Sequence, residues 1–562
     1  MNTITANTFK LATPFWLKSD HRIANWITTI VLVALVVATS GINLWINTLN
    51  KAFYDALQTL NNVAFYHSVA MVFLAIAFLI VVVTVLRYLE QALEIRWRKS
   101  LTDSMMNRWL NGHTFYRMER DGLCDNPDQR IAEDVREYVK LMLNLAIGFI
   151  ANLGTLVTMG WILWKSAGPM TFHYSDTSAT IHGYLFWLAI SWGIIQTLVT
   201  HLAGHKLAGL TVEQETAEAD FRFSLAQVRE ASEQIALYRG NAVEQGRLDR
   251  LFNAIRLNWS QLMRQNIYLN VSTNGFAAVA LLVPILALAP KVLSGELTLG
   301  TLMQSISAFT STTAAVAWFA LSYRDLFQLS ARVRRLSKMS EAMAQHTTTG
   351  IQVSRDSAVD SVNGEDISLS LPNGKLLSTI GNLLFTSGER WIIQGPSGVG
   401  KSTLLRAIAG LWPFGKGKVM IPATVRVMFM PQKNYLPDGP LTETLAYPEE
   451  ASKFDYRDFK GVLIDCKLPH LVEHLNESAR WSHRLSPGEQ QRLAFARALL
   501  FKPDILFLDE VSSALDNATE AHLYQLLISK LPECTVISVA HRTTVERFHD
   551  KRLNISTPAV SV

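Results

Sequence analysis

The segment Gly395-Pro-Ser-Gly-Val-Gly-Lys401-Ser402-Thr403 has the residue types and spacing of a phosphate-binding loop, G-x-x-x-x-G-K-[ST]. Its glycines allow backbone N–H groups to turn towards phosphate oxygens without a Cβ in the way. Lys401 can reach the β- and γ-phosphates of a nucleotide, and the Ser402 hydroxyl can ligate Mg²⁺. We therefore expect the nucleotide to contact Gly395, Pro396, Ser397, Gly398, Val399, Gly400, Lys401, Ser402 and Thr403.

The flanking sequence suits this loop. A short apolar run beginning at Trp391 precedes it, and a helix-like run from Thr403 to Leu411 follows it. Such a helix would direct the positive end of its dipole at the phosphates. A glycine-rich turn without a ligand is the alternative, but it would not need every motif position filled between a strand and a helix.

Two carboxylates follow a second apolar run, which starts at Lys502 and ends in Asp509-Glu510. We expect Asp509 to hold Mg²⁺ directly or through water, and Glu510 to act as general base towards the attacking water. Carboxylates in this position can also simply cap the next helix. The phosphate-binding loop upstream favours the catalytic interpretation.

Gln432 and His541 each follow a further apolar run, Val427–Met430 and Ser538–Ala540 respectively. We expect Gln432 to reach the metal or the water, and His541 to bond the γ-phosphate. An isolated Gln or His is more often structural. Here each ends a predicted parallel strand, and the carboxyl edge of such a sheet is where α/β proteins bind ligands.

Leu485-Ser-Pro-Gly-Glu-Gln490 precedes a helical run. Ser486 and Glu489 have the spacing of a capping box, and Pro487 occupies the favoured first helical position. This helix N-terminus would make a second anion site, with Ser486, Gly488 and Glu489 as the candidate contacts.

The elements that must position these residues differ between the two halves of the 562-residue chain. Long apolar stretches fill the first part, and an α/β pattern fills the part after about residue 350. The net charge of +5 is too small to indicate nucleic-acid binding. The cysteines Cys124, Cys466 and Cys534 lack metal-ligand spacing and indicate a reducing compartment. No cleavable signal is expected at the N-terminus.

Six segments are long enough to cross a membrane. They lie near 26–46, 68–88, 142–164, 183–204, 270–290 and 300–322, the fifth being interrupted by Pro284 and Pro290. The 89–140 and 205–269 loops are rich in Arg, whereas the 47–67, 165–182 and 291–299 loops hold one Lys each and no Arg. The positive-inside rule therefore predicts that both termini and both long loops are cytoplasmic.

Both long loops are helical by pattern, and each contains a break, at Asn126-Pro127 and at Gly240. Each tip could dock on the ATP-binding half or be a solvated turn. The polar residues within the spans are also ambiguous: they could line a substrate path or bond back to their own helices. They are Gln196, Thr200, His201, Ser305, Ser307, Thr310, Ser311, Thr312 and Thr313.

In their order along residues 360–550, these motifs and Ser513-Ala-Leu-Asp516 resemble the ATPase of ABC transporters. Asn126-Pro-Asp-Gln-Arg-Ile131 and Gly410-Leu-Trp-Pro413 are similar to the YddA/BacA-type bacterial half-transporters and the peroxisomal subfamily D acyl transporters. The resemblance implies an exporter-like helical transmembrane domain of six spans (1–340), a linker (341–362) and an α/β P-loop ABC ATPase domain (363–562).

It further implies a homodimer in a bacterial inner membrane that sandwiches two ATP, with Mg²⁺, and transports a substrate. A membrane-tethered ATPase that gates or senses is the alternative function. Uptake and export both stay open, because BacA-type relatives are associated with uptake and the architecture looks like an exporter's.

Two residues depart from the family pattern. Pro487 stands where the signature usually has Gly and has no N–H to donate, so we expect an altered but working clamp. Leu371 stands where exporters often have an aromatic residue under the adenine, so selectivity for ATP over GTP is open.

Overall fold

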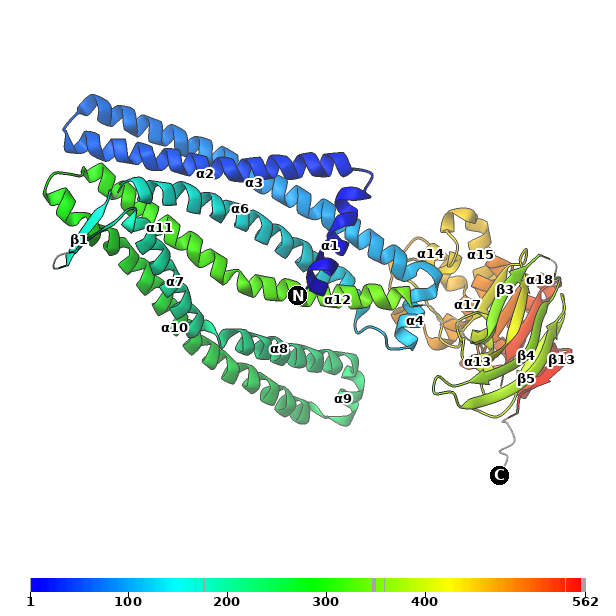
Figure 1. The fold of residues 1–562 in the computed structure, drawn as a ribbon. Helices are drawn as coiled ribbons and strands as arrows, with labels where there is room; N and C mark the ends of the chain where they lie inside the picture. The colour runs from blue at the N-terminus through cyan, green and yellow to red at the C-terminus, as the bar shows by residue number, and fades with distance from the viewer. Residues whose placement is uncertain are drawn as a thin grey trace. The chain divides into compact units, whose positions relative to one another are not determined.

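The computed structural model describes residues 2–166, 168–174, 177–345, 350–357, 359–540 and 542–556 (Figure 1). His541, a predicted site residue, lies outside these ranges. The chain divides into two compact units, Met1–Met343 and Ala344–Val562.

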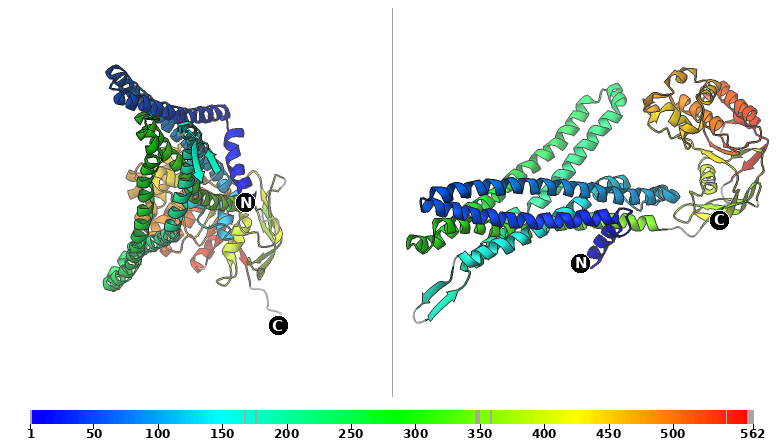
Figure 2. Two further views of the ribbon diagram at one scale, coloured as in Figure 1. Left: turned by 60° about the vertical axis from the view of Figure 1, so that its left-hand side comes forward. Right: turned by 90° about the horizontal axis from the view of Figure 1, so that it is seen from above.

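In its described residues, the first unit is helical apart from one hairpin. Its helices are α1 (Asn2–Leu17), α2 (Arg22–Gln58), α3 (Asn62–Leu110), η1 (Asn111–His113), α4 (Thr114–Arg120), α5 (Pro127–Gln129), the π-helical turn η2 (Arg130–Asp134), α6 (Val135–Ser166), α7 (Tyr184–Gly204), α8 (Leu207–Glu230), α9 (Ser232–Tyr238), α10 (Asn241–Leu293), α11 (Leu299–Leu321) and α12 (Tyr323–Ala344). An antiparallel hairpin, β1 (Met170–Tyr174) and β2 (Thr177–Ile181), connects α6 to α7 (Figure 2). The sequence predicts only a loop over 165–182.

Among the described residues, five helical segments are long and apolar enough to span a membrane: Arg22–Gln58, Asn62–Arg120, Pro127–Ser166, Tyr184–Glu230 and Asn241–Leu293. The sixth predicted span falls on α11, which has no charged residue but whose mean hydropathy is lowered by several Ser and Thr residues. It packs against α2, α6, α7 and α10, so α11 is central to the bundle. On α3, Phe73 and Ile80 are 70% and 60% exposed, as expected for side chains that face lipid.

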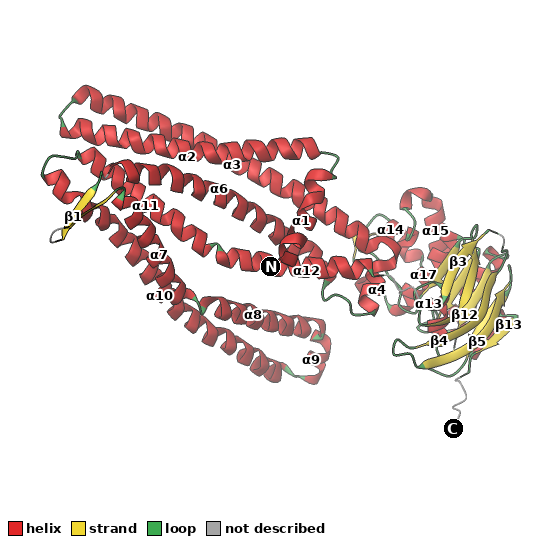
Figure 3. Cartoon of the chain, viewed as in Figure 1, coloured by secondary structure: helices red, strands yellow, loops and turns green. Residues whose placement is uncertain are grey.

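Several helices extend well past the apolar segments. α3 has 49 residues and α10 has 53. Pro284 and Pro290 lie inside α10 without ending it. α8 packs along α10, and the two form a long hairpin with α9 at its tip (Figure 3).

Both predicted breaks are turns between helices. Asn126 adopts a left-handed conformation with φ of 47° immediately before α5. At the other tip the left-handed residue is Arg239, with φ of 55°, whereas Gly240 has an ordinary φ of −77°. The chain thus reorients at the second tip one residue before the glycine that predicted it.

Hydroxyl groups of α11 bond mainly within the helix. Ser305 donates to the carbonyl of Thr301 at 2.8 Å, and Thr313 donates to that of Thr310 at 2.9 Å. Ser305 also lies 3.1 Å from the Ser166 hydroxyl of α6. These contacts favour helix packing over a substrate path for these residues.

The second unit contains two large sheets. One has five parallel strands in the order β13-β6-β12-β11-β8, and the other has four strands in the order β3-β7-β4-β5. Their bounds are β3 (Gln352–Asp356), β4 (Val362–Ser370), β5 (Leu376–Phe385), β6 (Arg390–Gln394), β7 (Gly415–Pro422), β8 (Val427–Met430), β11 (Ile505–Asp509), β12 (Thr535–Val539) and β13 (Lys551–Asn554). β3 lies within 341–362, the predicted linker, and pairs with β7.

Helices and short elements cover these sheets. They are α13 (Lys401–Ile408), β9 (Gly439–Pro440), α14 (Leu441–Ala446), η3 (Ala451–Lys453), α15 (Tyr456–Asp465), η4 (Pro469–His474), β10 (Ser478–Ala479), α16 (Trp481–Arg484), α17 (Pro487–Phe501), α18 (Asn517–Lys530) and η5 (Thr543–Phe548). One apolar core, which includes Phe385, Leu404 and Phe507, fixes α13 between the sheets. A second core, which includes Trp481 and Phe495, holds α14–α17 together.

Candidate functional site

The phosphate-binding loop, Gln432 and Asp509-Glu510 lie at the carboxyl edge of the parallel sheet. Asp509 of β11 is paired in register with Val539 of β12, which is paired with Ile393 of β6. Leu508 is paired with Met430 of β8. The strands therefore end level with one another, and the phosphate-binding loop, Gln432 and Asp509-Glu510 leave the sheet at one edge.

The glycines of the loop are required by its backbone. Gly395, Gly398 and Gly400 have φ values of 154°, 80° and 103°, which disfavour any other residue. A Cβ on Gly395 would lie 2.4 Å from the Ile555 carbonyl oxygen. Gly400 is the N-cap of α13, so the loop leads directly into a helix N-terminus.

Lys401 is only 6% exposed and its ammonium lies under the loop. It donates hydrogen bonds to the carbonyl oxygens of Gly395, at 2.8 Å, and Pro396, at 3.0 Å. Burial lowers the pKa of Lys401, and the charges of Glu510 and Asp509 oppose that shift. A phosphate group would give this buried cation a stronger partner than two carbonyls.

Ser402 and Asp509 are adjacent. The Ser402 hydroxyl donates to Asp509 Oδ1 at 2.8 Å. Burial raises the pKa of Asp509; the bond from Ser402 opposes this, and the Glu510 charge adds to it. The two oxygen donors fit Mg²⁺, which usually takes one or two carboxylates plus phosphates and water. Within the described ranges, no group of three or more His, Cys, Asp or Glu side chains offers a competing metal cage.

Glu510 is held in an unusual backbone conformation. Its φ of 51° is left-handed, which is uncommon for a residue other than glycine. Its N–H donates to the Val539 carbonyl at 3.0 Å, and its Oε2 accepts a hydrogen bond of 3.0 Å from Gln432 Nε2. Such strain is typical of functional positions, and here it fixes the carboxylate beside Gln432.

The Ser486 element forms the predicted capping box. Glu489 N–H donates to Ser486 Oγ, and Glu489 Oε2 accepts from the Ser486 N–H at 2.9 Å and hydroxyl at 2.7 Å. The Ser486 bond is the main cause of the lowered pKa of Glu489. Pro487 lies in the first turn of α17. A Cβ on Gly488 would meet only ordinary contact, 3.4 Å from the Ala514 carbonyl oxygen.

This element and the phosphate-binding loop are not joined. In the part of the chain that the structure describes, the hydrogen bonds of Ser486 and Gln490 run to neighbouring residues, and none reaches Gly395–Thr403.

Leu371, the residue predicted beside the base, is half-buried in the β4–β5 turn, where its N–H donates to the Lys375 carbonyl at 2.8 Å.

Two positioning residues were missed from the sequence. Gln491 binds the 513–516 loop, accepting from the Ala514 N–H at 2.9 Å and donating to Ser513 Oγ at 3.0 Å. Arg542 binds the same loop by donating to the carbonyls of Ser513 and Leu515. Arg542 directly follows the predicted His541, and Gln491 directly follows the Ser486 element, so both were adjacent to recognised motifs.

A third missed residue, Arg497, connects α17 to the segment that follows Gln432. Its Nη2 donates to the carbonyls of Tyr435, at 3.1 Å, and Thr444, at 2.7 Å. Burial lowers the pKa of Arg497 to about 10. An arginine within an apolar helical run was the available signal.

Two family descriptions match the chain. "ABC transporter transmembrane region 2" matches residues 15–293, and "ABC transporter" matches residues 379–513.

Relatives match along nearly the whole chain. An uncharacterized ABC transporter ATP-binding protein of Haemophilus influenzae is 34% identical over 91% of this chain and 86% of its own length. The inner membrane ABC transporter ATP-binding protein YddA of Escherichia coli is 32% identical over 97% of this chain and 96% of its own length. The human lysosomal cobalamin transporter ABCD4 is 29% identical over 82% of this chain and 80% of its own length.

The fold is also similar to a solved structure. A bacterial Atm1-family ABC exporter with ATP bound superposes with a TM-score of 0.72 at 16% identity, covering 96% of this chain and 95% of that one. The exporter fold is therefore common to both.

Proposed function

The chain belongs to the ABC transporter family, which couples ATP hydrolysis to transport across a membrane, and from this premise we propose that it works as a homodimer with shared nucleotide sites. The observation that most supports ATP hydrolysis by each chain is the pairing of Ser402 with Asp509 and of Gln432 with Glu510 at one sheet edge, beside the buried ammonium of Lys401. This arrangement suits nucleotide hydrolysis.

Each side chain has a role in this proposal. The loop amides and Lys401 bind the β- and γ-phosphates, and Ser402 and Asp509 hold Mg²⁺, which when bound neutralises phosphate charge. Glu510 takes a proton from the attacking water. Gln432, bonded to Glu510 at 3.0 Å, positions that carboxylate. His541 contacts the γ-phosphate, a role that follows from its sequence position alone.

We assign Ser486 and Gly488 to the nucleotide of the second copy. The capping box orients the α17 N-terminus, whose first-turn N–H groups suit a phosphate. Pro487 contributes no N–H, so the Ser486 hydroxyl and the Gly488 N–H carry this contact.

The α9 tip is proposed to dock on an ATP-binding unit. Tyr238 and Leu237 at this tip are 87% and 76% exposed, and Val243 at the start of α10 is 75% exposed. Apolar side chains grouped at the end of a long hairpin mark an interaction surface. This exposure favours docking over a solvated turn. Docking would let movements at the nucleotide sites reach the membrane spans through α8 and α10.

The protein is membrane-embedded, and we place it in the bacterial inner membrane with both termini, both long helical loops and the ATPase unit cytoplasmic. The Arg-rich 89–140 and 205–269 segments support this orientation. A cysteine scan with a membrane-impermeant maleimide in intact cells tests it. We expect labelling at position 296, between α10 and α11, and none at position 238.

Flux in proteoliposomes tests the transport function. Wild type should move a substrate from a panel of lipids, acyl-CoAs, peptides and corrinoids when ATP is supplied, and that substrate should stimulate hydrolysis. Glu510→Gln should abolish the flux. Hydrolysis with no vectorial movement of any candidate would favour a gating or sensing ATPase.

A disulfide trap tests the shared site. With Cys124, Cys466 and Cys534 replaced, Ser397→Cys and Ser486→Cys should cross-link two chains when ATP is present in the Glu510→Gln background. Ser397→Cys with Ser452→Cys, a surface serine of η3, is the matched control. A cross-link within a single chain would contradict the head-to-tail arrangement.

A further inference from the structure

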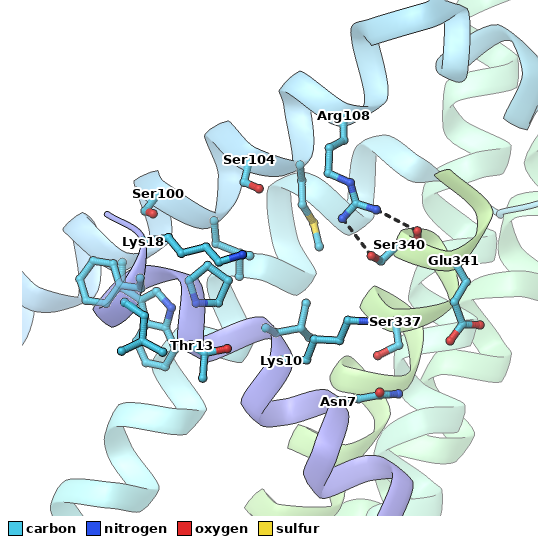
Figure 4. A pocket seen from close by; sticks show the side chains of 17 residues that line it. Asn7, Lys10, Thr13, Lys18, Ser100, Ser104, Arg108, Ser337, Ser340 and Glu341 are labelled. Atoms are coloured by element: carbon cyan, nitrogen blue, oxygen red, sulfur yellow. Dashed lines mark hydrogen bonds between the residues drawn. The ribbon is translucent and has the colours of Figure 1, made fainter. Parts of the chain in front are cut away.

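A groove of about 380 Å³ lies between α1, the last third of α3 and the end of α12 (Figure 4). Its floor is apolar and includes Phe15, Trp97 and Met105, all of them buried. Its walls carry hydroxyl groups and three cationic side chains. These polar residues are Lys10, Thr13, Lys18, Ser100, Ser104, Arg108, Ser337 and Ser340.

The charge of the groove is unbalanced. Glu341 is the single acidic side chain among the described residues that line it, against Lys10, Lys18 and Arg108. Arg108 donates to Ser340 Oγ at 2.9 Å and to the Ser340 carbonyl at 3.0 Å, neither of them a negative charge. Within the described ranges, neither lysine ammonium has a hydrogen bond or an ion pair. In Figure 4, Lys10 reaches towards Ser337 and Lys18 extends beside Ser100 and Ser104.

A buried donor at the same place also has no partner. Trp97 is 1% exposed, and its indole N–H has no acceptor among the described residues. A buried unpaired N–H is uncommon in proteins and carries a desolvation penalty. The lysines and the hydroxyl groups around them mark the groove as a place for an acceptor-rich, negatively charged group.

An apolar groove of about 360 Å³ continues from this one. Leu17 lines both, and the second is otherwise lined by Trp16, Arg22, Ile23, Trp26, Ile27 and Ile30 at the junction of α1 and α2. Ile23, Ile27 and Ile30 are 70%, 57% and 62% exposed at the start of the first span. Trp and Arg beside such residues are typical of the membrane–water interface.

We propose that the two grooves together bind one anionic phospholipid of the cytoplasmic leaflet. Its phosphate lies between Lys10 and Lys18 among the hydroxyls, and one acyl chain crosses Leu17 and follows Ile23, Ile27 and Ile30. Cationic side chains beside an interfacial helix attract anionic lipids, and the apolar floor accepts the glycerol and first methylenes. The choice of leaflet rests on the orientation proposed above.

The bound lipid would fasten α1 to α3 and α12. α12 is the helix that leads out of the first unit, and Arg108 already connects it to α3. The site is therefore placed to make the packing of these cytoplasmic helices depend on the lipid composition of the membrane.

Native mass spectrometry of the full-length protein from nanodiscs tests the inference. From equimolar phosphatidylglycerol and phosphatidylcholine, wild type should retain phosphatidylglycerol. Lys10→Gln with Lys18→Gln should lower that retention roughly 10- to 30-fold, because each lysine near an anionic surface contributes about 1 kcal/mol. Lys99→Gln with Lys140→Gln removes two nearby charges outside the groove and should change little. Lys10→Arg with Lys18→Arg should restore retention and shows that the site still folds.

The outcomes separate the possible ligands. Equal retention of both lipids, or equal loss in the Lys99/Lys140 control, would overturn the proposal. If inorganic phosphate or glycerol 3-phosphate displaced the bound phosphatidylglycerol as effectively as added phosphatidylglycerol does, the groove would be a site for a free phosphate instead. ATPase activity measured on the same samples reports separately on the nucleotide sites, so a failed nucleotide proposal would leave the lipid result standing.

Discussion

The carboxylate of Asp134 accepts two hydrogen bonds from the guanidinium of Arg335, 2.8 Å from Nε and 2.9 Å from Nη2. Arg332 and Arg130 donate to the same carboxylate, which is fully buried at the join between η2 and α6. Arg335 and Arg332 belong to α12, some 200 residues further along the chain. One carboxylate therefore ties the segment between α3 and α6 to the helix that leaves the bundle.

Asp134→Asn should destabilise the first unit strongly. It removes the negative charge that three guanidinium groups share, and breaking a buried pair costs about 3–5 kcal/mol. We expect the lower end, because all three arginines reach solvent. Thermal unfolding followed by circular dichroism measures the loss. Asp128→Asn, at an exposed position of α5, is the control, and equal midpoints for the two variants would contradict the role of Asp134.

Glu510→Gln should retain ATP binding and lose hydrolysis by ~10²–10⁴-fold, the usual contribution of a general base. The amide can still accept the hydrogen bond from Gln432, so the local geometry persists. Phosphate release and binding of a fluorescent ATP analogue measure the two properties separately. Glu533→Gln, on an exposed turn before β12, should behave as wild type. Near-normal turnover in Glu510→Gln would exclude the general-base role.

Lys401→Ala should weaken nucleotide binding by roughly 10- to 100-fold, because a hydrogen bond to a charged group contributes about 1.5–3 kcal/mol. Isothermal titration with ATP in the presence of Mg²⁺ measures the change. Lys375→Ala removes one positive charge from an exposed position in the β4–β5 turn and should leave nucleotide affinity unaltered. An unchanged affinity in Lys401→Ala would count against the phosphate-binding loop as the nucleotide site.

Much of the site was predictable because its signals are local in the sequence. The loop glycines, the Asp509-Glu510 pair and the Ser486 capping box each follow from a few adjacent residues, and parallel strands bring the first two to one edge. The positive φ of Glu510 has no such signal, since it results from the tertiary bond of its N–H to Val539.

In the helical unit, too, features with a local sequence pattern were predictable, and features that depend on tertiary contacts were not. Apolar runs predicted the spans, but not that α10 would pass unbroken through Pro284 and Pro290. The Asp134 cluster could not be predicted either, because Arg332 and Arg335 come from a distant helix and the π-helical turn has no local pattern. The β1–β2 hairpin was missed because its segment lies between two strong apolar runs that dominated the interpretation.

Asp509→Asn should stabilise the nucleotide-free ATP-binding unit. Burial raises the pKa of Asp509 above its ordinary value, so the folded state bears the cost of an ionised carboxylate at neutral pH. This cost is fully present above the folded-state pKa and disappears as the pH falls through it. The amide keeps the bond from Ser402 without the charge. We therefore expect the midpoint of this unit to rise, each 1 kcal/mol of stability corresponding to about 2–4 °C in a domain of this size.

The same substitution should remove most of the thermal stabilisation by Mg²⁺ and ATP, because the metal needs the ionised oxygen. Scanning fluorimetry from neutral pH down to the lowest pH at which the unit stays folded, with and without ligand, measures both effects. In wild type the ligand-induced shift should shrink on acidification as Asp509 protonates. Asp360→Asn, at an exposed position near the start of the unit, is the control. A lower ligand-free midpoint in Asp509→Asn would show that its charge stabilises the fold instead of serving the metal.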